Sequence, residues 1–240
     1  HEAIVLTGAE GLLTKSLESL GIPFYLSPSL QRAIHPLRDL LALQSIYKTI
    51  GRLKPDIVST HSSKSGILGR LACWFQGVPC LFTAHGWAFT EGVPETEKRI
   101  YGLLERLFAP LAKRIVCVSE HDVTIAIANG ISAKRLLCIH NGMPDIPSHL
   151  RAQPGSSGKD GLVHLVMVAR FDDQKDHATL LHACSELQML HLDLIGDGPN
   201  LENMQTLALK LGISDRVSFL GFRDDVGELM SKAHLFGLIS

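Results

Sequence analysis

Short apolar runs alternate with helical patterns along almost the whole chain, and this alternation constrains the fold more than any other feature. Strands that are apolar throughout and separated by helices are typical of a parallel sheet covered on both faces. We therefore expect an α/β protein with doubly wound sheets. The expected strands of the first half are "EAIVLT", "DIVST", "CLFTA", "RIVCVS" and "LLCIH", each except the last followed by a candidate helix.

Two of these expected helices have clear ends. The first runs from about residue 36 to residue 53 and stops before Pro55, which cannot continue a helix. The second covers about residues 64–76 and ends at Gly77, which suits a left-handed cap. Helical spacing predicts that the first helix shares one apolar face made by Leu40, Leu43, Tyr47 and Ile50.

Between residues 141 and 161 proline, glycine and small polar residues replace the alternating pattern, as in an interdomain linker. We divide the chain into a Rossmann-like domain over 1–142, a linker over 143–161 and a second Rossmann-like domain over 162–240. The second domain resumes the alternation with "LVHLVMVAR", "LHLDLIG", "RVSFLG" and "AHLFGLIS". Because a doubly wound domain normally has about six strands, we expect this one to be incomplete.

Composition narrows the classes of function. A formal net charge of −1 gives no general attraction to nucleic acid, and no apolar run of about 18 residues is present to span a membrane. The five cysteines are scattered, mostly in apolar segments, and show no CxxC pair or metal-ligand spacing. These features favour a cytoplasmic protein with reduced thiols that needs no metal ion.

Two cations mark the start of the second domain. Arg170 follows an apolar strand, and Lys175 falls in or just before the first turn of the next helix. Ligands of open parallel sheets bind at the carboxyl ends of strands, where a helix start also favours anions. An arginine fork and a lysine suit a diphosphate. The alternative is a solvated basic pair whose charge balances that of the acidic residues Asp172, Asp173 and Asp176.

Two further strand ends follow in the same domain. In "IGDGP", Gly196 and Gly198 permit a close backbone approach, and Pro199 suits the first position of the next helix, although a plain turn is the alternative. In "FLGFR", Phe222 and Arg223 could stack on a ring or read its edge. No stretch follows the GxGxxG pattern, which disfavours nicotinamide cofactors.

The first domain has its own polar strand ends. "STHSSKSG" contains His61 and Lys64, and "TAHGWAFTEG" contains His85, Thr90 and Glu91. Histidines that end two strands are candidates for contact with a ligand, although a lone histidine is more often structural. Trp87 beside these polar groups suggests an apolar wall for a sugar ring.

A basic segment over residues 98–114 aligns six apolar residues on one stripe with basic residues beside it. We interpret it as a core-facing helix; the alternative is a surface that touches anionic lipid. The apolar residues are Ile100, Leu103, Leu104, Leu107, Phe108 and Leu111, and the basic ones are Lys98, Arg99, Arg106, Lys113 and Arg114.

Together, "THSSKSG", "TAHGWAFTEG", "RIVCVSE", "IHNG", "VARFDDQKDH", "IGDGP" and "VSFLGFRDDV" resemble a retaining glycosyltransferase of the GT-B architecture, glycosyltransferase family 4. The likeness spans nearly the whole chain and is greatest to bacterial enzymes of capsule and exopolysaccharide synthesis. It implies two Rossmann-like domains facing a cleft. The family also has an earlier strand with a glycine-rich loop and a later loop with two glutamates, neither of which occurs here, so we expect these 240 residues alone to be weakly active or inactive.

The resemblance also implies roles for the candidate residues. Arg170 and Lys175 would hold the diphosphate of a sugar nucleotide and stabilise it as it departs, and His85 would contact the donor sugar. Gly196, Asp197, Gly198, Phe222 and Arg223 would line the nucleotide pocket, and the acceptor would enter near His61, Lys64, Thr90 and Glu91.

The implied reaction moves a hexose or N-acetylhexosamine to a glycan or lipid-linked acceptor, without a metal ion, at the inner face of the membrane. Two alternatives stay open: a sugar-nucleotide epimerase of the same architecture, and a non-catalytic nucleotide-sugar binding fragment.

Overall fold

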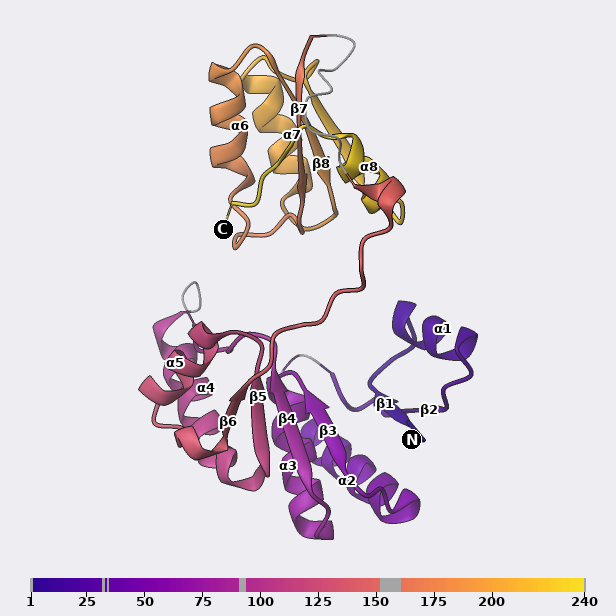
Figure 1. Ribbon diagram of the computed structural model, residues 1–240. Coiled ribbons are helices and arrows are strands. Elements are labelled where there is room, and N and C mark those ends of the chain that lie inside the picture. The colour runs from indigo at the N-terminus through magenta and orange to yellow at the C-terminus, as the bar shows by residue number, and fades with distance from the viewer. Residues whose placement is uncertain (1, 32, 34, 91–93, 152–160, 240) are drawn as a thin grey trace. The chain divides into compact units, whose positions relative to one another are not determined.

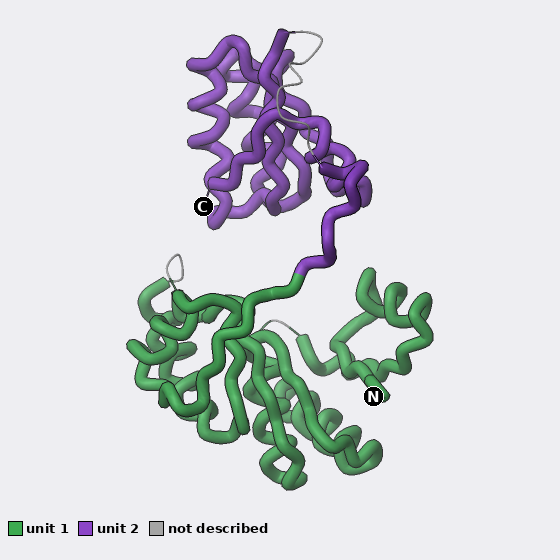
Figure 2. The backbone as a smooth tube through the Cα atoms, viewed as in Figure 1, with its two compact units in different colours: residues 1–142 green, residues 143–240 purple. Residues whose placement is uncertain are grey.

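The computed structural model describes residues 2–31, 33, 35–90, 94–151 and 161–239. The chain divides into two compact units, residues 1–142 and 143–240 (Figure 2). Both contain parallel strands joined by helices, which confirms the predicted α/β class. Within the described residues, no helix is both long and apolar enough to cross a membrane.

The first unit contains two parallel sheets (Figure 1). Strands β3 to β6 form a four-stranded sheet in sequence order, and β1 pairs with β2 in a separate two-stranded sheet. The elements are β1 (Val5–Thr7), α1 (Leu12–Ser19), β2 (Phe24–Leu26), α2 (Pro36–Leu53), β3 (Val58–His61), α3 (Ser63–Gln76), β4 (Cys80–Ala84), α4 (Glu95–Phe108), η1 (Ala109–Leu111), β5 (Arg114–Cys117), α5 (Glu120–Ala128), η2 (Ala133–Arg135) and β6 (Leu136–Cys138).

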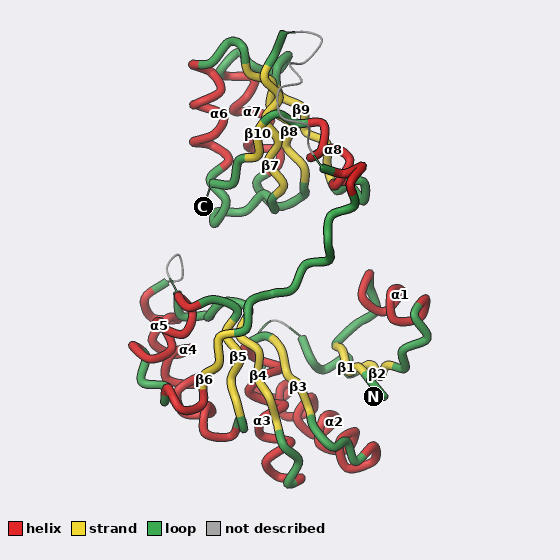
Figure 3. Tube along the Cα trace, in the orientation of Figure 1, coloured by secondary structure: helices red, strands yellow, loops and turns green. Residues whose placement is uncertain are grey.

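The second unit contains one parallel sheet in the order β10-β7-β8-β9. Helices α6 and α7 lie together on one side of its strands, and α8 lies apart from them (Figure 3). The elements are η3 (Ser148–Leu150), β7 (Val163–Val168), α6 (His177–Glu186), β8 (Leu190–Ile195), α7 (Leu201–Lys210), β9 (Val217–Gly221), α8 (Val226–Lys232) and β10 (Leu235–Phe236).

Helix boundaries follow local chemistry. Helix α2 has the predicted bounds, with Pro36 at its first position and the His35 side chain accepting a hydrogen bond from the Arg38 N–H. Helix α3 ends at Gly77, whose φ of 68° is the left-handed cap predicted from the sequence. Pro199 is an exception, because α7 begins at Leu201 with Asn200 as its cap, so the proline precedes the helix.

Two predicted apolar faces are confirmed only in part; on α2, Ile50 is buried and Leu43 packs against the core. Helix α2 buries Ala42, Ile46 and Ile50, whereas Leu40 and Tyr47 of the predicted face are 63% and 41% exposed. The face of α2 that packs against α3 includes the small residue Ala42 and leaves the larger Leu40 and Tyr47 outside the interface. Small Ala42 permits that close approach, since it packs in one cluster with Ala72 and Cys73 of α3.

Helix α4 also departs from the predicted core-facing stripe. It buries Gly102 and Glu105, while Ile100, Leu103 and Leu107 are 55%, 56% and 64% exposed. The buried side is fixed by polar contacts. Asn129 donates a hydrogen bond to the Gly102 carbonyl, and Glu105 forms an ion pair with an arginine of α3. The predicted stripe is therefore divided: Leu104, Phe108 and Leu111 are half-buried, and the other three residues face solvent.

Candidate functional site

The carboxyl ends of β3 and β4 bring two predicted histidines into contact. These strands pair in parallel, and His61 is in register with Thr83, so His85 lies just beyond the same edge. The His61 and His85 rings stack with centroids 5.3 Å apart, and Nδ1 of His61 lies 3.0 Å from Nε2 of His85. Nε2 of His61 lies 3.2 Å from the Ser59 hydroxyl oxygen. Both histidines remain exposed to solvent.

This pair favours a neutral His61. Partial burial lowers the pKa of His61 from its usual value, and the charge of His85 lowers this pKa further. The short contact between the two ring nitrogens requires one N–H to point at one lone pair. The contact holds one proton between the two rings and does not use Nδ1 of His85. That nitrogen is suited to a hydrogen bond with a sugar hydroxyl.

The other first-unit candidates have different surroundings. Lys64, near the start of α3, forms an ion pair with Asp39 of α2 at 2.6 Å and also donates to the Ala33 carbonyl. Thr90 donates to the Trp87 carbonyl at 3.0 Å. Lys64 is thus engaged in joining α3 to α2, and Thr90 closes the turn after β4. Glu91 lies outside the described residues.

Trp87 does not provide the apolar wall expected for a sugar. Its side chain is 3% exposed, its Nε1 donates to the Asp122 carbonyl at 2.9 Å, and its ring packs against Phe82 and Phe89. An indole with its N–H satisfied inside the core has no face left for a ligand. The sequence pattern was misleading because the turn after β4 directs this ring inward.

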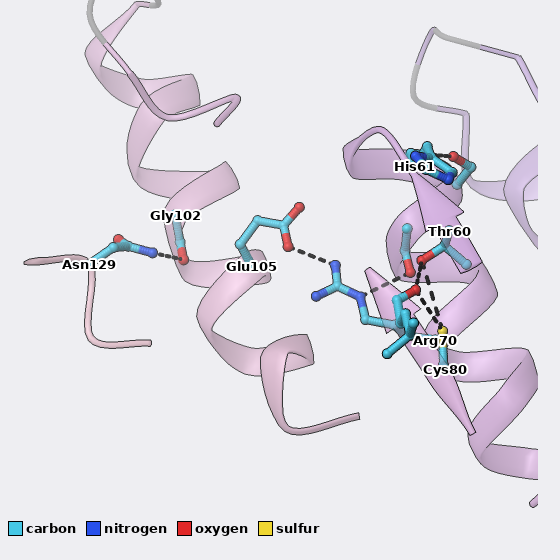
Figure 4. Close-up of polar contacts among 10 residues, drawn as sticks. Thr60, His61, Arg70, Cys80, Gly102, Glu105 and Asn129 are labelled. Atoms are coloured by element: carbon cyan, nitrogen blue, oxygen red, sulfur yellow. Dashed lines mark hydrogen bonds and ion pairs between the residues drawn. The ribbon is translucent and has the colours of Figure 1, made fainter. Parts of the chain in front are cut away.

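A buried ion pair joins α3 to α4, and sequence reasoning missed it. Arg70 of α3 and Glu105 of α4 approach within 2.6 Å with side chains 0% and 1% exposed (Figure 4). Nε of Arg70 donates to the Gly66 carbonyl at 2.9 Å, and its guanidinium lies 4.3 Å from the centre of the Phe82 ring. Burial raises the pKa of Glu105, and the charge and hydrogen bonds of Arg70 oppose that shift.

In the second unit, the ends of three strands lie in register. Val168 of β7 pairs with Ile195 of β8, which pairs with Gly221 of β9. Two residues beyond each of these positions stand Arg170, Asp197 and Arg223. The sequence prediction of three polar strand ends at one edge is consistent with this register.

The two predicted cations of this edge differ in their contacts. The Arg170 side chain is 61% exposed, and its Nε lies 3.9 Å from Asp172, an exposed and weak ion pair. Lys175 is half-buried and, within the part of the chain that the structure describes, forms no ion pair. It lies two residues before α6, within the position predicted from the sequence.

The start of α6 is already capped. The Asp176 carboxylate accepts hydrogen bonds from the Thr179 N–H at 3.0 Å and from its hydroxyl at 2.6 Å, and these bonds lower the pKa of Asp176. The helix terminus itself is therefore less available to an anion than its position suggested. Attraction for an anion at this edge rests on Arg170 and Lys175.

His177 was missed as a positioning residue for Lys175. Its side chain is 3% exposed, stacks on Phe171 with centroids 4.1 Å apart, and its Nδ1 lies 2.8 Å from the Lys175 carbonyl oxygen. A carbonyl only accepts, so Nδ1 carries the proton. The signal in the sequence was a histidine two residues after the candidate lysine.

Gly196 and Gly198 permit close approach, but of the chain to itself. A Cβ at Gly196, whose φ is +144°, would lie 2.0 Å from the Ala169 carbonyl oxygen. A Cβ at Gly198 would lie 2.4 Å from the Phe171 carbonyl oxygen. These glycines fix the loop after β7, which carries Arg170, against the loop after β8.

The third strand end presents one aromatic and one paired cation. Phe222 is 74% exposed, so its ring is open to a planar ligand. Arg223 donates from Nε and Nη2 to the two Asp225 carboxylate oxygens, at 2.7 and 2.5 Å. This bidentate pair lowers the pKa of Asp225 and holds the guanidinium in one orientation.

Comparison with known proteins gives the family. Residues 1–142 match the family described as "Glycosyl transferase 4-like domain", and residues 151–240 match "Glycosyl transferases group 1". The chain is similar to the UDP-Gal:alpha-D-GlcNAc-diphosphoundecaprenol alpha-1,3-galactosyltransferase of Escherichia coli, with 30% identity over 246 residues. It is also similar to the putative glycosyltransferase EpsD of Bacillus subtilis (strain 168), with 29% identity over 213 residues.

These alignments cover 96% and 82% of the chain but 63% and 55% of the two relatives, so the chain spans less than two thirds of their lengths. Among solved structures, Anabaena Alr3699/HepE in complex with UDP and glucose is similar with a TM-score of 0.78 and 22% identity, over 98% of this chain and 65% of that one. The apo form of the lipopolysaccharide outer core galactosyltransferase WaaB is similar with a TM-score of 0.65 and 17% identity, over 95% and 70%. The chain therefore belongs to the glycosyltransferases of GT-B architecture that join a glycosyl transferase 4-like domain to a group 1 domain.

Proposed function

We propose that this chain forms the reacting part of an enzyme that transfers a hexose or N-acetylhexosamine from a nucleoside diphosphate sugar to a lipid-linked glycan acceptor in bacterial polysaccharide synthesis. The observation that carries the proposal is the edge of the second-unit sheet, where register places Arg170 and Arg223 with Lys175 nearby. The first donor to consider is a uridine diphosphate sugar, because similar proteins are named for UDP-Gal or were crystallised with UDP.

The second unit would bind the nucleotide. Arg170 and Lys175 would hold the diphosphate and stabilise its charge as the bond to the sugar breaks. Arg170 is exposed and only weakly paired, so its charge is available to a ligand. Phe222 would stack on the base, and Arg223 would read its edge from the orientation that Asp225 gives it. These cations supply the positive charge that the leaving diphosphate needs, so we propose a reaction without a metal ion.

The first unit would bind the sugar and the acceptor. His85, held by His61, would form a hydrogen bond with a sugar hydroxyl near the reacting carbon. We propose that Thr90 and Glu91 take part in binding the acceptor. Lys64 would act mainly by joining α3 to α2, because it already forms an ion pair with Asp39. We propose that the donor configuration is retained, as in the family that the chain resembles.

The exposed face of α4 would place the enzyme at the inner surface of the cytoplasmic membrane. Ile100, Leu103 and Leu107 form an aliphatic stripe more than half exposed, and Arg99 and Arg106 lie beside it. An amphipathic helix of this kind binds anionic lipid through apolar burial and basic charge together. A lipid-linked acceptor would be presented at the same surface.

A transfer assay tests the proposal against its alternatives. The full-length protein would be incubated with UDP-galactose or UDP-N-acetylglucosamine, with and without a polyprenyl diphosphate-linked N-acetylglucosamine acceptor, and in the presence or absence of EDTA. The proposal expects an acceptor-dependent glycolipid that EDTA does not abolish. Interconversion of sugar nucleotides without acceptor would indicate an epimerase, and UDP binding without any turnover would indicate a binding module; either result contradicts the proposal.

A further inference from the structure

Three potential metal ligands lie together on one face of the second-unit sheet. His164 of β7 is in register with His191 of β8, and Asp193 follows two residues later on the same side of β8. One ligand atom from each of the three lies within 4.8 Å of those of the other two, and all three side chains are half-buried. Of the described residues, no other group of three histidine, cysteine or acidic side chains meets this distance condition.

The cluster lies on the face opposite the hydrophobic core of this unit. Leu165, Leu192 and Leu194 point to the α6 and α7 side and pack in that core. Because strand side chains alternate, His164, His191 and Asp193 point the other way. Two imidazoles and a carboxylate therefore gather on the side of the sheet away from that core.

The distances suit a small cation that favours nitrogen. The His164 and His191 rings have centroids 5.1 Å apart, and Nε2 of His191 lies 3.4 Å from Oδ1 of Asp193. Tetrahedral zinc with bonds of about 2.0–2.1 Å places its ligand atoms about 3.3 Å apart. Small side-chain rotations would bring the three atoms from within 4.8 Å to that spacing.

Further polar groups lie next to the cluster. Oγ of Ser218 on β9 lies 3.0 Å from Nε2 of His191, and Nδ1 of His234 accepts a hydrogen bond from the His164 backbone N–H at 2.9 Å. The His234 ring also lies 5.7 Å from that of His164.

We propose that His164, His191 and Asp193 bind one divalent transition-metal ion of the zinc class, with a fourth position left for water. Two nitrogen ligands favour zinc over magnesium or calcium, which prefer oxygen. The site is separate from the nucleotide edge, because His164 lies near the start of β7 whereas Arg170 lies two residues past its end at Val168. The bound metal joins β7 to β8 and stabilises the second unit. The proposal does not depend on the proposed transfer reaction.

Calorimetric titration of the chelator-treated protein with zinc chloride tests the site. We expect one equivalent bound tightly by the protein, and affinity lowered by about 30-fold or more in His191→Ala and in Asp193→Asn, in line with the loss of a ligand. His182→Ala is the matched control, since it removes an exposed imidazole of α6 in the same unit. It should bind zinc as the wild type does.

Cobalt provides a second readout that does not depend on a variant folding. Co²⁺ added to the wild-type protein should give the strong visible absorption of tetrahedral coordination, and zinc should displace it. The melting temperature of the second unit should also rise by about 5 °C or more at saturating zinc. Absence of stoichiometric zinc binding, an octahedral cobalt spectrum, or unchanged affinity in both ligand variants would each overturn the proposal.

Discussion

The buried pair of Arg70 and Glu105 leads to a prediction about stability. Replacing Glu105 with leucine would leave a guanidinium group without a counter-charge in a site that is 0% exposed. Such a loss costs about 3–5 kcal/mol of the free energy of unfolding. Arg70→Met should cost less, because the stranded carboxyl group can take up a proton, whereas a guanidinium cannot release one.

The double variant Arg70→Met/Glu105→Leu separates the charge effect from packing. Exchange of both partners for apolar residues of similar volume removes the buried charges together, so its stability should lie within about 1–2 kcal/mol of the wild type. An exposed pair on α4, Arg99 and Glu95 at 3.5 Å, is the matched control. Its replacement should change stability by about 0.5 kcal/mol or less.

Urea denaturation followed by tryptophan fluorescence measures these effects. Both tryptophans, Trp74 and Trp87, lie in the first unit, so the signal reports on the unit that contains the pair. The single variants should lower the urea midpoint, and the double variant should recover most of the loss. Losses that simply add in the double variant, or a Glu105→Leu loss below about 1 kcal/mol, would refute the reasoning.

Three further predictions follow from other contacts. Gly196→Ala should weaken UDP binding by about 10-fold or more in a calorimetric titration, because its Cβ would collide with the Ala169 carbonyl and displace the loop that carries Arg170. The pKa of His61 is lowered in the folded protein, so the unfolded chain binds a proton at this imidazole more tightly. The free energy of unfolding should therefore fall as the pH drops below about 6.5. His61→Gln should reduce this pH dependence in urea titrations at several pH values. Leu103→Glu should reduce co-flotation with vesicles containing anionic lipid, whereas Leu209→Glu, at an exposed leucine of α7, should not.

Local patterns predicted the secondary structure well. The proline at the start of α2 and the glycine after α3 set those boundaries through backbone chemistry that is independent of the rest of the fold. Parallel strands place their carboxyl ends at one edge, so the approach of His61 to His85 was within reach of the sequence. The distance between their rings was not, because it depends on the turn after β4.

Features that depend on packing between distant segments were missed. Helical spacing identified the apolar stripe of α4 but not that the helix would bury Glu105 instead, since that choice depends on Arg70, 35 residues earlier. The ligand cluster of the second unit escaped notice for a similar reason. Register between β7 and β8, and not spacing along the chain, brings His164 to His191.

The central claim is that Arg170 and Lys175 bind the diphosphate of the donor. Isothermal titration of UDP into the wild type, Arg170→Ala, Lys175→Ala and the control Lys210→Ala tests it most directly, since Lys210 is an exposed cation at the end of α7 in the same unit. Loss of one charge-assisted contact to a phosphate, worth about 1.5–3 kcal/mol, should weaken UDP binding by about 10- to 150-fold in each of the first two variants and leave the control unchanged. Wild-type affinity in both Arg170→Ala and Lys175→Ala would contradict the account.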